Sequence, residues 1–143
     1  MASCSQDGSL AIWIPSITGE STFWKGHTAA VRSVAFTPDG KQVVSASDDK
    51  TIKLWTVNRS KYHFLTYNLI YLYGVCNYMP LFFARFVSSF TDHTNWVRCV
   101  RPSPDGNQLI SCSDDKTIKL WDTKSAQCLH TFYEPKVMKH NAS

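Results

Sequence analysis

Two groups of side chains in this 143-residue sequence have the composition of a nucleophilic serine triad. Their members are His27, Ser45 or Ser47 and Asp49 in one group, and His93, Ser111 or Ser113 and Asp115 in the other. In a catalytic triad the histidine takes the serine proton while the carboxylate orients the imidazole. The duplication argues against catalysis, because an active site needs one unique arrangement whereas a scaffold feature recurs at a fixed period. The two groups are therefore predicted to be structural.

An eleven-residue phrase that ends in tryptophan carries the serines and the aspartate of each group. It occurs at 3–13, 45–55 and 111–121, and His27 and His93 precede the second and third tryptophans by the same interval. Between histidine and tryptophan come a valine-rich run, a Pro-Asp-Gly turn, an apolar run with serines and an Asp-Asp-Lys turn. Short runs with period-two alternation, separated by turn residues, predict an antiparallel β-meander.

The first two tryptophans of the phrase, Trp13 and Trp55, are separated by an interval typical of a four-stranded propeller blade. With Gly26-His27 opening one unit and Trp121-Asp122 closing another, the sequence resembles the WD-repeat family. The resemblance implies a buried hydrogen-bond network in each blade. Its members would be His27, Ser45, Ser47, Asp49 and Trp55 in one blade, and His93, Ser111, Ser113, Asp115 and Trp121 in the next.

The expected fold class is all-β, a partial WD-repeat β-propeller of about two and a half four-stranded antiparallel blades. Since Met1 comes just before the first phrase, we expect a fragment of a closed ring, and the family resemblance implies that this ring has seven blades. The expected segments are the end of a truncated blade (1–24), a second blade (25–61), an apolar insertion (62–85), a third blade region (86–134) and a tail (135–143). Another chain that completes the ring remains an alternative.

The insertion is inferred from spacing and composition. The interval from Trp55 to His93 is far longer than the equivalent interval from Trp13 to His27, and 62–84 contains no Asp, Glu, Lys or Arg. Three interpretations stay open: a membrane span, for which the length suffices, an apolar loop on the propeller rim, and an intron translated in frame. We favour the translated intron, because 81–85 is what a pyrimidine-rich tract followed by AG could encode.

Other chemistry is not indicated by the sequence. It has no Gly-rich phosphate loop and no His-Glu-x-x-His, so we expect no enzyme activity, no cofactor and no small-molecule substrate. The five cysteines never approach Cys-x-x-Cys spacing, which argues against a zinc site. Cys4 and Cys112 share a repeat position with Ala46, which indicates a small apolar slot and a reducing compartment. The charges that give +4 are dispersed, which argues against a nucleic-acid partner.

A finer resemblance is to the proteome-of-centriole group of WD-repeat proteins. It is carried by stretches such as 27–34, 46–55 and 113–122, and above all by Asn-Trp-Val-Arg-Cys at 95–99. This resemblance implies a scaffold for centriole and basal body assembly, with cytoplasmic and centrosomal localisation. The implied partners are centriolar scaffold proteins and tubulin, with a membrane involved only if 62–85 inserts.

The expected partner contacts lie just after the histidine of each unit. Trp96 stands where the other copy has Ala30, so the repeat itself does not need it. Arg32 and Arg98 occupy equal positions, and aromatic and arginine side chains make the strongest anchors at interfaces. Asn95 joins them by adjacency. The alternative functions are a WD-repeat adaptor in a ubiquitin ligase or splicing complex, and a truncated or mis-spliced product without function.

Overall fold

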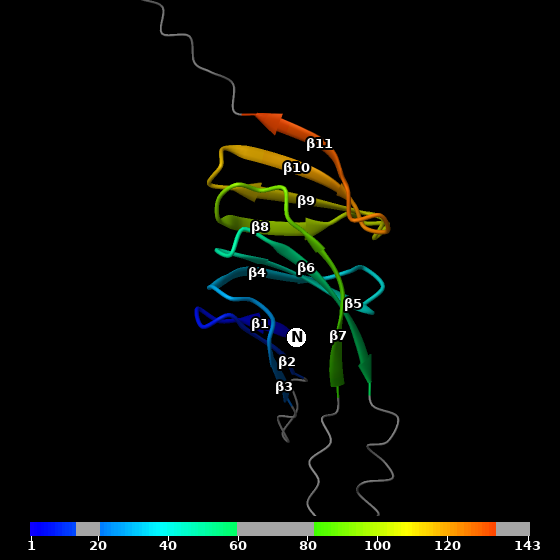
Figure 1. Ribbon diagram of the computed structural model, residues 1–143. Helices are drawn as coiled ribbons and strands as arrows, with labels where there is room; N and C mark the ends of the chain where they lie inside the picture. Colours follow the sequence, from blue (N-terminus) through cyan, green and yellow to red (C-terminus); the bar gives the residue numbers. More distant parts are fainter. Residues whose placement is uncertain (14–20, 60–81, 134–143) are drawn as a thin grey trace, which may run out of the picture.

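The computed structural model describes residues 1–13, 21–59 and 82–133, and all regular structure in these ranges is β-strand. Three antiparallel sheets lie one beyond another in a stack (Figure 1). The first has the order β1 (Ala2–Cys4), β2 (Ser9–Trp13), β3 (Ser21–Lys25). The second has the order β4 (Val31–Phe36), β5 (Gln42–Ser47), β6 (Ile52–Arg59), β7 (Phe82–Phe90). The third has the order β8 (Val97–Pro102), β9 (Gln108–Ser113), β10 (Thr117–Asp122), β11 (Cys128–Tyr133).

The prediction of an all-β, partial propeller is confirmed. Each sheet is called a blade from here on, and the second and third blades have four strands each. The turns fall where the sequence indicates. At the Pro-Asp-Gly turns, Gly40 and Gly106 have φ values of 68° and 72°, and at the Asp-Asp-Lys turns Lys50 and Lys116 have φ values of 70° and 65°. The glycines take this left-handed backbone easily, whereas the lysines hold it at a conformational cost.

The outer strand of the second blade, β7, begins before the boundary expected from the repeat. Phe86, expected as the first residue of the third blade region, lies inside β7 and is the register partner of Trp55. Residues 82–85, expected as the end of the insertion, pair with β6 because β6 extends to Arg59 and offers them backbone partners. The strand that completes a blade therefore comes from the following sequence unit.

The rest of the expected insertion, 62–81, and the expected tail at 135–143 lie outside the described residues. The interpretations of 62–81 as a rim loop, a membrane span or a translated intron therefore stay predictions. Among the residues that are described, no helix is long and apolar enough to cross a bilayer.

The core lies between the blades and has two parts. Leu10, Ile12, Val31, Val43 and Trp55 fill the space between the first and second blades. The larger part lies between the second and third blades, and its buried members are Val44, Ala46, Ile52, Leu54, Phe90, Val97, Val100, Leu109 and Trp121. Burial of one such side chain contributes about 1.5–3 kcal/mol, so contact between blades is what stabilises the stack.

The far face of the third blade repeats the contact face of the second but is uncovered by the described residues. Val44 and Ile52 are fully buried, whereas Ile110 and Ile118, which occupy the same repeat positions one blade later, are 47% and 44% exposed. Phe90 and Phe132 pair with Ile52 and Ile118, and they are 1% and 48% exposed. The pattern that buries one blade is thus present again on a free surface.

Candidate functional site

The first predicted group forms a continuous chain of hydrogen bonds in the second blade, from Asp49 through His27 and Ser45 to Trp55. Nδ1 of His27 lies 2.8 Å from Oδ2 of Asp49, and Nε2 lies 2.8 Å from Oγ of Ser45. Trp55 Nε1 donates to the same Ser45 oxygen at 2.9 Å. His27 precedes β4, Ser45 is in β5, Asp49 is in the turn after it and Trp55 is in β6. The network therefore joins the loop before the blade to its second and third strands.

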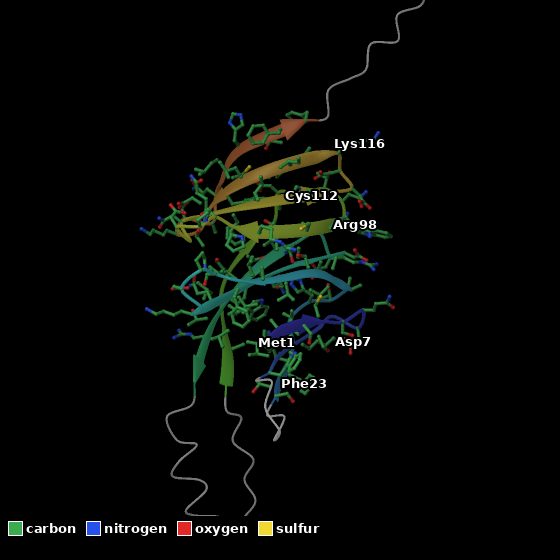
Figure 2. All side chains as sticks on the ribbon, turned by 180° about the vertical axis from the view of Figure 1, so that it is seen from behind. Met1, Asp7, Phe23, Arg98, Cys112 and Lys116 are labelled. Carbon is green, nitrogen blue, oxygen red and sulfur yellow. The ribbon has the colours of Figure 1, made fainter. Side chains whose placement is uncertain are left out.

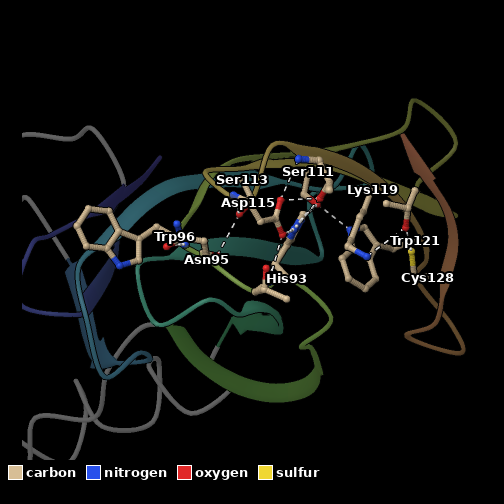
Figure 3. A network of polar contacts seen from close by, with 12 residues as sticks. His93, Asn95, Trp96, Ser111, Ser113, Asp115, Lys119, Trp121 and Cys128 are labelled. Carbon is tan, nitrogen blue, oxygen red and sulfur yellow. Dashed lines mark hydrogen bonds and ion pairs between the residues drawn. The ribbon is translucent and has the colours of Figure 1, made fainter. Parts of the chain in front are cut away.

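The third blade contains the same network (Figure 3). The His93 Nδ1 to Asp115 Oδ2 distance is 2.7 Å, and the His93 Nε2 to Ser111 Oγ distance is 2.8 Å. Trp121 Nε1 donates to Ser111 Oγ at 2.8 Å, and the Trp121 ring packs edge-on against the His93 ring. The serine that contacts the histidine is the first of the two candidates in both blades.

The second serines, Ser47 and Ser113, bond elsewhere. Ser47 Oγ donates to the carbonyl of Ala29 at 3.2 Å and accepts from the backbone N–H of Asp49 at 3.1 Å. Ser113 Oγ likewise donates to the Asn95 carbonyl at 3.1 Å and accepts from the Asp115 N–H at 3.2 Å. These serines hold the loop before each blade against the Asp-Asp-Lys turn rather than joining the imidazole.

The order of donors follows from the chemistry of the groups. An indole N–H can only donate, so the Ser45 oxygen accepts a hydrogen bond from Trp55. The Ser45 hydroxyl then donates its own hydrogen bond to His27 Nε2. The remaining ring proton is then on Nδ1 and is donated to Asp49. This is the proton order of a serine triad, but the His27 side chain and Ser45 are 0% exposed. No substrate reaches such a hydroxyl, and its lone pairs already stabilise the tryptophan.

The carboxylates of both networks are held ionised. Burial would raise the pKa of Asp115, but hydrogen bonds from Thr117 and His93 outweigh it and lower the pKa to about 2. For Asp49, burial is likewise outweighed by hydrogen bonds from His27 and Thr51, and its pKa lies well below the ordinary value. The threonines were not predicted as members; Thr51 and Thr117 donate to the aspartates at 2.7 and 2.6 Å. Their equal place shortly after each aspartate is the signal that could have revealed them.

The expected partner contacts are exposed and lie away from the buried networks. Arg32 Nε donates to both carboxylate oxygens of Asp48 at 3.0 and 2.9 Å, and Arg98 Nε donates to those of Asp114 at 2.9 and 3.0 Å. Arg98 also approaches Asp48 of the second blade at 4.0 Å. The hydrogen bonds raise the pKa of each arginine. The four side chains thus form an alternating chain of charges across two blades.

Trp96 and Asn95 complete this surface, which we call the rim cluster (Arg32, Asp48, Asn95, Trp96, Arg98 and Asp114). The Arg98 guanidinium carbon lies 4.9 Å from the centre of the Trp96 ring, and Trp96 is 44% exposed. Asn95 Oδ1 accepts from the Trp96 N–H at 2.8 Å, which fixes the turn before β8. In Figure 3 Trp96 points away from the buried network. Asp48 and Asp114 were not predicted from the sequence, although both follow their arginines by the same interval.

The rim cluster is on the edge of the stack where the β-turns of successive blades gather. Asp7, Arg98 and Lys116, one from the first blade and two from the third, lie along this edge (Figure 2). No group of three or more His, Cys, Asp or Glu side chains among the described residues could hold a metal ion. The rim cluster presents paired charges and one partly exposed aromatic ring.

Stacked antiparallel blades, of which the second and third each contain a buried His-Ser-Asp-Trp network, define a β-propeller repeat protein. The family pattern described as "WD domain, G-beta repeat" matches residues 19–56 and 84–122. The chain belongs to this family. The two matched segments correspond to the two units that begin with the buried histidines His27 and His93.

The curated relatives are longer proteins with different names. Nuclear distribution protein PAC1-2 of Uncinocarpus reesii is 29% identical over 92% of this chain and 37% of its own length. Pre-mRNA-processing factor 17 of Homo sapiens is 32% identical over 80% of this chain and 16% of its own length. DDB1- and CUL4-associated factor 13 of Dictyostelium discoideum is 42% identical over 45% of this chain and 14% of its own length. The chain therefore spans well under half the length of these relatives.

The expected localisation to the centriole, centrosome and basal body is wrong. The names of the relatives concern nuclear distribution, association with DDB1 and CUL4, and pre-mRNA processing. The finer resemblance to centriolar proteins rested above all on 95–99. It also rested on stretches such as 46–55 and 113–122, and for these two the structure gives a physical reason. They contain the left-handed lysine, the network aspartate and the buried tryptophan that any blade of this kind needs. Such stretches indicate the fold of the chain and not its localisation in the cell.

Proposed function

We propose that this chain is a non-enzymatic protein-interaction module, and that the rim cluster contacts a protein partner within a multi-subunit complex. The observation that carries the proposal is the set of contacts that Arg98 makes. Arg98 is paired with Asp114, approaches Asp48 in the neighbouring blade and stacks on an exposed tryptophan. Tryptophan and arginine are among the residues most enriched at the energetic centres of protein interfaces.

Preorganisation supports the same proposal. Each arginine is held by two carboxylate oxygens, so a partner would not have to restrict a freely rotating side chain on binding. The blade itself does not need Trp96, because Ala30 occupies the same position in the second blade and its carbonyl accepts the equivalent backbone hydrogen bond. A large apolar ring kept at an exposed, dispensable position is typical of a contact residue.

The burial of the triad-like serines supports a non-enzymatic role. Both hydroxyls are enclosed and fully engaged by histidine and tryptophan. Within this role, the names of the relatives favour an adaptor in a larger assembly, such as a ubiquitin ligase or a splicing complex. The apolar insertion at 62–81 and the tail at 135–143 remain predictions from the sequence. The proposed contact role does not depend on them.

The test is affinity capture with the purified chain and with Trp96→Ala, followed by identification of bound proteins by mass spectrometry. Leu129→Ala is the matched control, because Leu129 is 50% exposed on the outer strand β11 and outside the rim cluster. Trp96→Ala should weaken capture of the specific partner by about tenfold or more, as for a hot-spot residue. Equal capture by all three chains would contradict the proposal.

The captured proteins also separate the two adaptor roles. DDB1 or CUL4 among the captured proteins would favour the ubiquitin ligase role, and pre-mRNA-processing proteins would favour the splicing role. A chain that shows no cooperative unfolding transition before capture would instead support the truncated or mis-spliced product that the sequence leaves open. Cooperative unfolding would contradict that interpretation.

A further inference from the structure

Two cysteines face each other across neighbouring strands of the third blade. Cys99 in β8 and Cys112 in β9 are register partners in an antiparallel pair, and both are partly exposed. The other described cysteines have no such neighbour, because Cys4 pairs with Leu10 and Cys128 pairs with Trp121. The sequence did not reveal the pair, since the Pro-Asp-Gly turn separates the two positions and a register irregularity precedes Cys99.

The geometry of the pair suits a covalent bond. Directly opposed residues in an antiparallel ladder have Cα atoms about 4.5–5.5 Å apart, and disulfides form at Cα separations of about 4.4–6.8 Å. Side chains of opposed residues also project from the same side of the sheet. A disulfide bond between the two sulfurs therefore requires little movement of the backbone.

The scaffold does not require cysteine at either position. Ser33 and Ala46 occupy the same places in the second blade, and they too are register partners. Ser33 Oγ lies 3.9 Å from Cys99 Sγ, so the Cys99 thiol borders the joint between the two blades. The second blade has a serine and an alanine at these positions, and Cys4 of the first blade pairs with Leu10, so among the described strands the opposed thiol pair belongs to the third blade.

We propose that Cys99 and Cys112 are a redox-sensitive thiol pair, which a disulfide oxidant such as glutathione disulfide converts into a cross-strand disulfide. One thiolate attacks a sulfur of glutathione disulfide, forming a mixed disulfide and releasing one glutathione thiolate. The second cysteine, as its thiolate, attacks the protein sulfur of that mixed disulfide and releases the other glutathione. The two protein thiols are oxidised, one glutathione disulfide is reduced to two glutathiones, and the two protons lost by the protein thiols are taken up by the glutathione thiolates.

Burial, together with the neighbouring Cys99, raises the pKa of the Cys112 thiol. Less thiolate is then present at neutral pH, so the reaction is slow there and accelerates as the pH rises. The bond closes a loop that contains the Pro-Asp-Gly turn at 104–106 and limits the conformations of the unfolded chain. Oxidation should therefore raise the temperature midpoint of unfolding, and reduction should lower it again.

The experiment uses the full chain with Cys4, Cys76 and Cys128 replaced by serine, so that only Cys99 and Cys112 can react. The reduced protein is incubated with glutathione disulfide, and its peptides are mapped by mass spectrometry without reduction. The expected product is a peptide pair linked through Cys99 and Cys112 in the monomer. The linked protein should unfold at a higher temperature than the reduced protein, and dithiothreitol should reverse both changes.

Cys112→Ser in the same background should stop at the glutathione adduct of Cys99 and show no rise in the midpoint. Stable glutathione adducts on both Cys99 and Cys112, or links only between chains, would overturn the proposal. If a serine variant fails to fold, peptide mapping of the unmodified chain decides between the same outcomes.

Discussion

The hydroxyl oxygen of Ser111 lies 2.8 Å from Nε2 of His93, at the centre of the third blade. It is enclosed by the blade, and the same oxygen accepts the indole N–H of Trp121. A single hydroxyl thus satisfies two larger polar groups that are themselves buried. The second and third blades each contain such a buried network, in addition to the apolar contacts between blades.

Removal of this hydroxyl should therefore be costly. In Ser111→Ala, the buried N–H of Trp121 loses its acceptor and His93 loses a donor, so we expect a loss of about 1–3 kcal/mol in the free energy of unfolding. Ser125→Ala is the control, because Ser125 is exposed and its side chain bonds Asp122 at the surface. Urea titration of both variants measures the difference. Equal losses would mean that the network does not depend on Ser111.

The network aspartates predict an acid-labile fold. The pKa of Asp115 is lowered in the folded chain from 3.8 to about 2, so its contribution to stability is fully present above the ordinary pKa and is lost as the pH falls through the lowered one. Asp115→Asn removes this titration and should flatten the fall of the unfolding midpoint across that window. Thermal unfolding at a series of pH values measures both curves. Parallel curves would show that other carboxyl groups govern the acid response.

Ile52 and Ile118 occupy the same position in successive blades but differ in exposure, 0% against 44%. Ile52→Ala opens a cavity in the core between blades and should lower the free energy of unfolding by about 2–5 kcal/mol. Ile118→Ala should have a much smaller effect on the isolated chain, because little of its environment is lost. Denaturant unfolding compares the two. A large loss for Ile118→Ala would mean that its face is covered in solution, for instance by another copy of the chain.

The close packing around Gly26 explains why a glycine precedes His27. A Cβ at this position would lie 2.8 Å from Leu10 Cδ1 and 2.8 Å from Trp55 Cζ2, closer than side-chain atoms approach. Gly26→Ala should therefore force one of these buried side chains from its place and destabilise the chain by about 1–3 kcal/mol. Gly106→Ala is a useful comparison, because it meets only Pro38 Cδ at 3.8 Å and its strain is that of a positive φ. A shift of the tryptophan fluorescence in Gly26→Ala, but not in Gly106→Ala, would indicate repacking around Trp55 rather than simple backbone strain.

The sequence revealed the blades because their requirements are local. Alternation defines the strands, and the Pro-Asp-Gly and Asp-Asp-Lys turns lie at fixed positions between them. The choice between Ser45 and Ser47 could not be made from the pattern. Residues two apart in a strand lie on the same face, so only the distance to His27 separates them, and that distance depends on the path of the chain before β4.

Contacts across strands and blades were also beyond the sequence pattern. The pairing of Arg98 with Asp114, and its approach to Asp48 in another blade, depend on how far one sheet is rotated against the next. The pairing of Cys99 with Cys112 depends on a register shift after Val97. The start of β7 at Phe82 depends on the length of β6. Each of these is set by a partner strand rather than by neighbours in the sequence.

The outer hairpin of the second blade has a consequence for how such chains change over evolution. Arg59 and Phe82 are direct partners in the ladder, so the described strands on either side of 60–81 end side by side. For a flexible loop closed by such a pair of strands, each doubling of its length adds only about 0.6 kcal/mol of closure entropy. The length of the connection between β6 and β7 therefore has little effect on which fold the blade adopts. Gene rearrangement could lengthen or shorten the chain here while selection on the rest of the blade continued unchanged.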